Sequence, residues 1–156
     1  MKIRKTNKRD SKKISDLHKL VLNKVNRKKD TDEFVDYLLD KYDSDYIKKK
    51  LDKGEVFCLI NKNKVIGTVG LEDNIVGKLY IHPKYLGKGL GNKLMDFIED
   101  YARKNGKRKL KLFPTNYAYK FYRKLGYRKV KSFIWKTDQF KRRVYIMEKK
   151  LKNKHN

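Results

Sequence analysis

Three glycines at alternate positions, Gly87, Gly89 and Gly91, separate an apolar run over residues 75–81 from a segment with strong helical periodicity. Glycine lets a backbone turn tightly and approach a ligand closely, and the first amides of a helix have no acceptor within that helix. A strand, a glycine loop and a helix in this order therefore predict a phosphate site at the start of the helix. The expected ligand is a phosphorylated cofactor.

Two familiar phosphate-binding motifs do not fit this loop. A P-loop requires two glycines five positions apart, followed by Lys and Ser or Thr, and the chain contains no such run. The dinucleotide fingerprint requires G-x-G-x-x-G, whereas the loop reads G-x-G-x-G. The glycine spacing therefore excludes both classes of nucleotide site.

Three further segments form a recognisable sequence pattern together with the loop. Residues 79–83 read Leu-Tyr-Ile-His-Pro, residues 118–127 fit A-x-x-F-Y-x-K-x-G-F/Y, and residues 147–151 read Met-Glu-Lys-Lys-Leu. In this order they resemble the fourth strand, acyl-CoA loop, fourth helix and closing strand of the GCN5-related N-acetyltransferases, the GNAT superfamily. The resemblance covers residues 3–151. It departs at Leu86, where Gln or Arg is usual, and at Thr115, which displaces the expected Asn to Asn116.

The resemblance implies an acetyl-CoA-dependent enzyme that moves an acetyl group directly to a primary amine. It places the pantetheine arm on backbone groups of Leu79, Tyr80 and Ile81, with a further hydrogen bond from Asn116. The pyrophosphate would lie on the loop, at Gly87, Lys88, Gly89, Leu90, Gly91 and Asn92. Acetyl-CoA is the expected cosubstrate, and no His, Cys and carboxylate spacing indicates a metal.

Two residues are candidates for proton transfer. Tyr122 occupies the position of the family's usual proton donor, where its phenol would protonate or orient the CoA thiolate. It also lies on the apolar side of a predicted helix, so packing in the core is the alternative interpretation. Glu72 and Asp73 are the nearest carboxylates for the general base, although such residues are more often solvated turn residues than catalysts. His82, before Pro83, is expected to be structural.

Periodicity predicts a mixed α/β domain with the order β-α-α-β-β-β-α-β-α-β-β, which is also the GNAT order. One helix follows Asp10 or Ser11, and a second starts at Asp30 with Glu33 completing a capping box. A short helical turn covers residues 44–51, and longer helices follow the glycine loop and start near Ala118. The strands are expected over residues 3–6, 56–61, 65–71, 75–81, 109–113, 130–136 and 143–148.

The 156 residues suit one domain over residues 1–151, followed by a basic tail at residues 152–156. No apolar run approaches the length of a membrane span, and the first residues lack the apolar stretch of a signal peptide, which favours a cytoplasmic protein. Cys58 is the only cysteine and lies in an apolar run, so a buried structural thiol is expected. The oligomeric state, monomer or homodimer, is left open.

A net charge of +25 is extreme for this length. Lys and Arg bind phosphate backbones through counterion release, so a catalytically weak GNAT-fold protein associated with nucleic acid or the ribosome is the alternative function. The charge is spread from end to end, and the chain is also rich in Asn, Ile and Tyr, whose codons, like those of Lys, are A/T-rich. Compositional drift is therefore the competing explanation of the charge.

The acidic residues gather in one segment. Seven of the 18 acids lie between Asp30 and Asp45, with Lys41 as the only base among them. In GNAT enzymes the first two helices border the acceptor site, so this segment predicts a cationic acceptor: a polyamine, a peptide N-terminus or a lysine. A solvated helix face is the equally weighted alternative.

Overall fold

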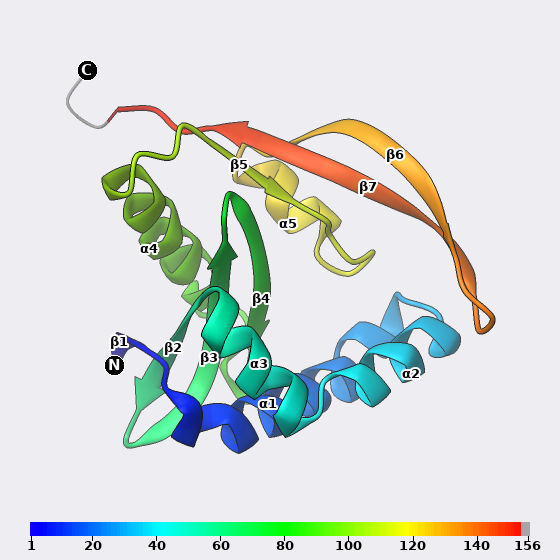
Figure 1. Cartoon of the computed structure of the whole chain (residues 1–156), viewed down its shortest axis with the longest axis horizontal. Helices are drawn as coiled ribbons and strands as arrows, with labels where there is room; N and C mark the ends of the chain where they lie inside the picture. The colour runs from blue at the N-terminus through cyan, green and yellow to red at the C-terminus, as the bar shows by residue number, and fades with distance from the viewer. Residues whose placement is uncertain (154–156) are drawn as a thin grey trace.

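Within the described residues, seven strands form one mixed sheet in the order β1-β2-β3-β4-β5-β7-β6 (Figure 1). The structure is a computed structural model, which describes residues 1–153; the end of the predicted basic tail, residues 154–156, lies outside the described residues. All neighbouring strands are antiparallel except β4 and β5, which are parallel. The strands are β1 (Lys2–Lys5), β2 (Glu55–Asn61), β3 (Lys64–Glu72), β4 (Ile75–Ile81), β5 (Lys109–Leu112), β6 (Arg128–Lys136) and β7 (Lys141–Lys150).

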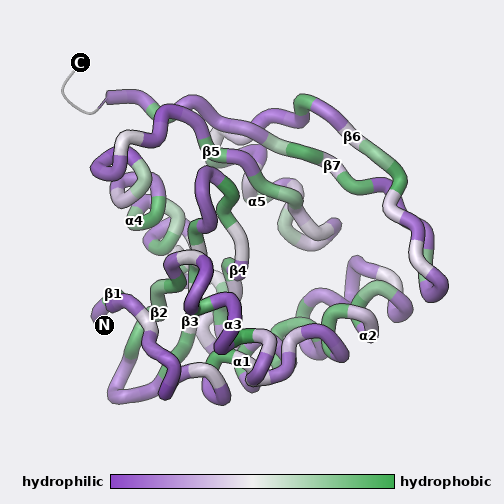
Figure 2. Tube along the Cα trace, viewed as in Figure 1, coloured by the Kyte–Doolittle hydropathy of each residue, from purple (hydrophilic) through white to green (hydrophobic). Residues whose placement is uncertain are grey.

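Helices cover both faces of the sheet. On one face lie α1 (Ser11–Lys24), α2 (Asp32–Lys41) and α3 (Ser44–Lys53), and on the other lies α4 (Leu90–Lys104). The short helix α5 (Tyr119–Lys124) adds Tyr122 to the core on the α4 side. The main apolar cluster lies between α4 and strands β2 to β5, and smaller clusters lie beneath α1 and α2. Figure 2 shows apolar segments along the central strands and polar ones along the outer loops.

The predicted order of strands and helices is confirmed, with one addition. Residues 44–53 form a helix of ten residues, α3, rather than a short turn, and Asp43 caps it instead of Ser44 by accepting from the Tyr46 amide at 2.7 Å. β4 has the predicted bounds, Ile75–Ile81. Cys58 is fully buried in β2, as expected.

The expected start of the second helix at Asp30 is wrong. α2 begins at Asp32, and the hydroxyl of Thr31 caps it by accepting from the Phe34 amide. Asp30 is instead buried, and its carboxylate accepts from the backbone amide of Asn116 at 3.0 Å and pairs with Arg142 at 3.5 Å. Aspartate is a common N-cap residue, which is why the sequence favoured a cap at Asp30. Its actual role depends on partners that are far away in the sequence.

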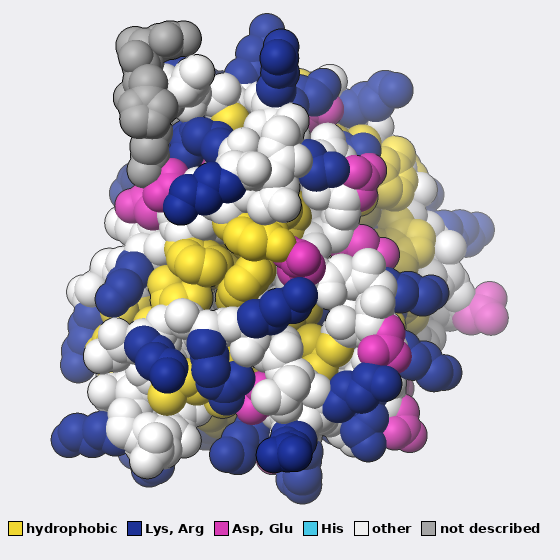
Figure 3. All heavy atoms as spheres, turned by 60° about the vertical axis from the view of Figure 1, so that its left-hand side comes forward, with side chains coloured by type: hydrophobic (Ala, Val, Ile, Leu, Met, Phe, Trp, Pro, Cys, Tyr) yellow, Lys and Arg dark blue, Asp and Glu magenta, His cyan; other side chains and the backbone are white. Residues whose placement is uncertain are grey.

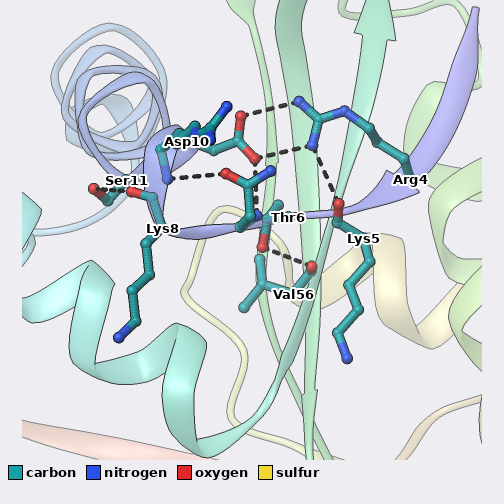
Figure 4. Close-up of polar contacts among 9 residues, drawn as sticks. Arg4, Lys5, Thr6, Lys8, Asp10, Ser11 and Val56 are labelled. Atoms are coloured by element: carbon teal, nitrogen blue, oxygen red, sulfur yellow. Dashed lines mark hydrogen bonds and ion pairs between the residues drawn. The ribbon is translucent and has the colours of Figure 1, made fainter.

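The N-terminal strand is tied to the sheet and to α1 by polar contacts (Figure 4). The hydroxyl of Thr6 donates to the Val56 carbonyl at 2.8 Å. The Arg4 guanidinium donates two hydrogen bonds to the Asp10 carboxylate, both at 2.9 Å, and this carboxylate also accepts from the Asn7 amide. Because Asp10 directly precedes α1, these bonds fix the start of that helix. No helix within residues 1–153 is long and apolar enough to cross a membrane.

Candidate active site

A cavity opens where β4 and β5 separate. The two strands pair at one register, Ile75 opposite Lys111, and the Lys111 amide donates to the Asn74 carbonyl at 2.9 Å. Beyond this point β4 has no further partner on β5 within the described chain. A cavity of about 930 Å³ is lined by β4, the glycine loop, the residues after β5, and α2. Free backbone groups along β4 therefore face a space large enough for an extended ligand.

β4 carries a bulge in the wall of this cavity. Gly77 lies opposite Gly70 and Tyr80 opposite Thr68, so β4 has one residue more than β3 between these pairs. Lys78, within the bulge, has a φ of 54°, which is unusual for a residue other than glycine. The extra residue changes the alternation of side chains. Leu79 packs on the α4 side of the sheet, whereas Tyr80 packs on the side of α1 and α2.

A buried chain of hydrogen bonds holds the bulge. The Thr68 hydroxyl donates to the Lys78 carbonyl at 2.6 Å, and the His18 Nε2 lies 2.9 Å from the same hydroxyl oxygen. Burial lowers the pKa of His18 to about 3, so its imidazole is neutral at ordinary pH. Because the Thr68 hydrogen is already used, Nε2 of His18 carries the proton and donates. These side chains fix the backbone of Lys78 in its strained conformation.

The glycine loop leads into α4. Gly87 and Gly89 have φ values of 77° and 75°, and a Cβ at either would meet nothing within 4 Å. Gly89 is the N-cap of α4, and no side chain caps this end of the helix. The first amides of α4 are therefore available to an anion, and the helix dipole favours negative charge there. Gly91 is a packing glycine, since a Cβ would lie 3.1 Å from the ring of Phe121.

Most of the residues predicted for the site lie together on this cavity. They are Leu79, Tyr80, Ile81, Gly87, Gly89, Leu90, Gly91, Asn92 and Tyr122.

Three predicted residues do not line the cavity. Lys88 places its ammonium 5.3 Å from the centre of the Tyr85 ring. Asn116 is exposed, and Thr115 takes the place at the cavity wall. Glu72, at the end of β3, pairs with Lys50 at 3.4 Å. The structure therefore brings no support for a direct catalytic role of Glu72. His82 accepts from the Lys84 amide at 3.1 Å and so caps the short helical turn over Pro83–Tyr85.

Tyr122 is both packed and accessible to the cavity. Its ring meets Phe121 and Tyr127 edge-on, with centroid distances of 5.3 and 5.9 Å. Burial raises the pKa of its phenol, which therefore stays protonated over the whole neutral range. The residue also lines the cavity wall. A protonated donor is thus available to a group bound in the cavity.

Aromatic side chains from α2 and the β6–β7 hairpin close the other end. The hairpin arches across the molecule to α2 (Figure 1). Trp135 of β6 lies edge-on to Phe34 and Tyr37 of α2, at centroid distances of 6.2 and 5.4 Å, and Phe140 packs on both. Phe34, Leu38, Phe133 and Trp135 line the cavity. This end therefore presents an apolar, aromatic wall.

The acids of the segment over residues 30–45 do not line the cavity, although other residues of this segment do. Asp32 and Asp36 pair with Arg27 and are 74% and 63% exposed in their side chains, Asp43 caps α3, and Asp30 pairs with Arg142. Among the described residues, no Asp or Glu lines the cavity, whose charged side chains are Lys41 and Lys78. The geometry therefore supports the alternative interpretation, in which the acids of this segment form a solvated helix face.

Sequence reasoning missed Lys78, His18 and Thr68. Lys78 is one of many lysines in this chain, and the bulge that exposes it depends on pairing with β3. The only available signal was a lysine inside an otherwise apolar strand, residues 75–81. No group of three or more His, Cys, Asp and Glu residues within residues 1–153 is arranged to hold a metal ion.

The mixed sheet opens between two parallel strands, and a glycine loop leads into the helix that follows the first of them. This arrangement is that of a protein that holds an extended, phosphorylated cosubstrate along a strand edge. The sequence model of the family described as "Acetyltransferase (GNAT) domain" matches residues 52–129, which span β2 to the start of β6. The chain therefore belongs to the GNAT acetyltransferase family, whose members are acetyl-CoA-dependent N-acetyltransferases.

Solved structures share this fold over nearly their whole length. A GCN5-related N-acetyltransferase from Rhodopseudomonas palustris superposes with a TM-score of 0.88 at 18% identity, covering 96% of this chain and 95% of the other. The PaiA N-acetyltransferase from Thermoplasma acidophilum, solved with coenzyme A, gives 0.78 at 19% identity and coverages of 96% and 98%. The putative acetyltransferase YncA from Salmonella typhimurium, solved with acetyl-CoA, gives 0.65 at 21% identity and coverages of 98% and 95%. No curated protein matches the sequence.

Proposed function

We propose that this protein transfers an acetyl group directly from acetyl-CoA to a primary amine bound in the cavity between β4 and β5. The observation that carries the proposal is the separation of these strands next to an uncapped α4 with an open glycine loop. The β4 edge at Leu79, Tyr80 and Ile81 offers backbone groups to the amides of a pantetheine arm. The amides after Gly87 offer hydrogen bonds to a pyrophosphate.

The reaction needs few protein groups. Acetyl-CoA supplies a thioester whose acyl carbon is open to attack by a neutral amine. The amine forms the new C–N bond, the C–S bond breaks, and the thiolate accepts a proton or a hydrogen bond from the Tyr122 hydroxyl. Because no carboxylate lines the described cavity, we infer that the amine loses its proton to water rather than to Glu72.

The predicted cationic acceptor and the alternative of nucleic-acid binding receive less support. A polyamine would meet Lys41 and Lys78 rather than the acidic segment. Figure 3 shows Lys and Arg side chains scattered over the visible face between acidic and apolar ones, and not gathered into one basic patch. Such a surface supports salt-sensitive, nonspecific attraction to polyanions.

Replacing Gly89 by valine is expected to weaken acetyl-CoA binding at least about tenfold. Gly89 has a φ of 75°, which a β-branched residue adopts only under strain, so the loop would leave its present conformation. The valine side chain would also occupy open space beside the first amides of α4. Calorimetric titration with acetyl-CoA measures the change.

Gly106→Val is the matched control. Gly106 has a φ of 80°, its Cβ would also meet nothing within 4 Å, and it follows the opposite end of α4. The same substitution there imposes the same kind of backbone strain, so it should lower stability without changing affinity. Equal affinities of the two variants, or no saturable binding by the unmodified protein, would reject the assignment of the loop.

A further inference from the structure

We propose that the acceptor is an apolar amino acid: a primary amine that carries a carboxylate beside it and an aromatic or branched aliphatic side chain. This rests on the acetyl transfer proposed above and adds the substrate class. The carboxylate would bind at Lys78 and Lys41, and the apolar side chain would lie against Phe34, Leu38 and Trp135.

Two lysines line the cavity near α2, where we place the acceptor; we call this the acceptor end. Neither lysine pairs with an acidic residue of the described chain. Lys78 lies on the β4 bulge and Lys41 is the last residue of α2, and both line the cavity. Neither forms an ion pair with any of the described residues, whereas neighbouring Lys50 pairs with Glu72 at 3.4 Å. The ammonium of Lys41 lies only over the rings of Tyr37 and Tyr46, at 5.9 and 5.4 Å. Two positive charges therefore face the cavity without an ion-pair partner among the described residues.

The environment of Lys78 gives an anion a further advantage. Burial, and then the nearby charge of Lys50, lower the pKa of Lys78 to about 8. The charge of Glu72 opposes this shift in part, and the charge of Lys41 adds a smaller lowering. A bound carboxylate would stabilise the ammonium form in this half-buried position. Lys78 would be largely charged at neutral pH, and an ion pair there is screened less by salt than one at the surface.

The apolar part of the cavity wall determines which side chain the acceptor carries beside its carboxylate. Phe34, Leu38, Phe133 and Trp135 form an apolar surface opposite the bulge, with Val21 and Val25 from α1 and its end. Such a surface stabilises an apolar side chain by removing it from water. Among the described residues it carries no carboxylate that would pair with a second ammonium group. The net charge of +25 repels polyamines at long range, whereas a zwitterionic amino acid has no net charge and is not repelled.

The test compares amines that differ only in the carboxylate. Phenylalanine and phenethylamine share one side chain, leucine and 3-methylbutylamine share another, and spermidine represents the polycations. Acetyl-CoA turnover is measured with each as acceptor. The carboxylate should raise kcat/KM at least about tenfold within each pair, the size of a charge-assisted hydrogen bond. Preference for phenethylamine or spermidine over phenylalanine would overturn the proposal.

Three variants separate charge from structure. Lys78→Gln should remove most of the preference for phenylalanine over phenethylamine by raising KM for phenylalanine alone. Lys78→Arg keeps the charge and should retain the preference. Lys49→Gln removes the same charge from an exposed site on α3 and should behave like the unmodified protein. An equal loss with both amines in Lys78→Gln would show that Lys78 only shapes β4.

Binding measured through Trp135 fluorescence distinguishes failure of the proposed carboxylate site from failure of acetyl transfer. It is the only tryptophan in the chain and lines the cavity, so its fluorescence reports binding without turnover. With CoA present, phenylalanine should change the emission saturably and at lower concentration than phenethylamine. Such binding without turnover would keep the carboxylate site and reject catalysis; neither binding nor turnover would reject the carboxylate site.

Discussion

Tyr122→Phe is expected to lower kcat about a hundredfold or more while acetyl-CoA binds with unchanged affinity. The phenol is held protonated by burial, and Tyr122 lines the cavity. Protonation of a leaving group by a positioned side chain contributes about 10²–10⁴-fold. Phenylalanine keeps the edge-on contacts with Phe121 and Tyr127, so the wall of the cavity should persist. The measurement is kcat at saturating acetyl-CoA with the fastest acceptor of the panel above.

Tyr119→Phe provides the control for this substitution. Tyr119 lies on the same helix and packs on Tyr145 at a centroid distance of 5.5 Å, and it does not line the cavity. Loss of its hydroxyl should leave kcat unchanged. If Tyr122→Phe also retains most of its activity, Tyr122 is a packing residue and the thiolate takes its proton from water.

Local patterns were enough to predict most elements and the part of the cavity wall formed by β4 and the glycine loop. The loop at Gly87 and Gly89 and the bounds of β4 follow from turn chemistry and apolar runs, which act within a few residues. The helix positions of α1 and α4 follow from periodicity for the same reason. The resemblance to a family then supplied the order of the segments and the place of Tyr122.

What sequence reasoning could not supply depends on pairing between distant segments. The bulge at Lys78 arises from the pairing of β4 with β3. The gap beside it arises because β4 and β5 pair at only one register within the described chain. Trp135 reaches Phe34 because the β6–β7 hairpin arches to α2. A strand pattern shows which residues prefer burial, but not which distant surface will bury them. Charge counts could not decide between the two interpretations of the acidic segment for the same reason. The acids of α2 lie away from the cavity wall, while two lysines line it.

Asp30 shows most clearly how a distant partner sets a residue's role. Its side chain is fully buried, and it joins the start of α2 to Arg142 on β7 and to the Asn116 amide after β5. The Arg142 guanidinium also lies 3.7 Å from the centre of the Phe34 ring. One carboxylate thus connects three elements that surround the acceptor end of the cavity.

Asp30→Ala is therefore expected to lower the free energy of unfolding by about 3–5 kcal/mol, because it leaves the charge of Arg142 buried without a partner. Urea unfolding followed by Trp135 fluorescence measures the change. Asp32→Ala removes a carboxylate two residues away that pairs with Arg27 in solvent, so its effect should stay within about 0.5 kcal/mol. A double variant, Asp30→Ala with Arg142→Met, should recover part of the loss, since no buried charge remains. Equal effects of the two single substitutions would mean that water reaches Arg142, and that the walls of the acceptor site are held by the aromatic contacts of Phe34 alone.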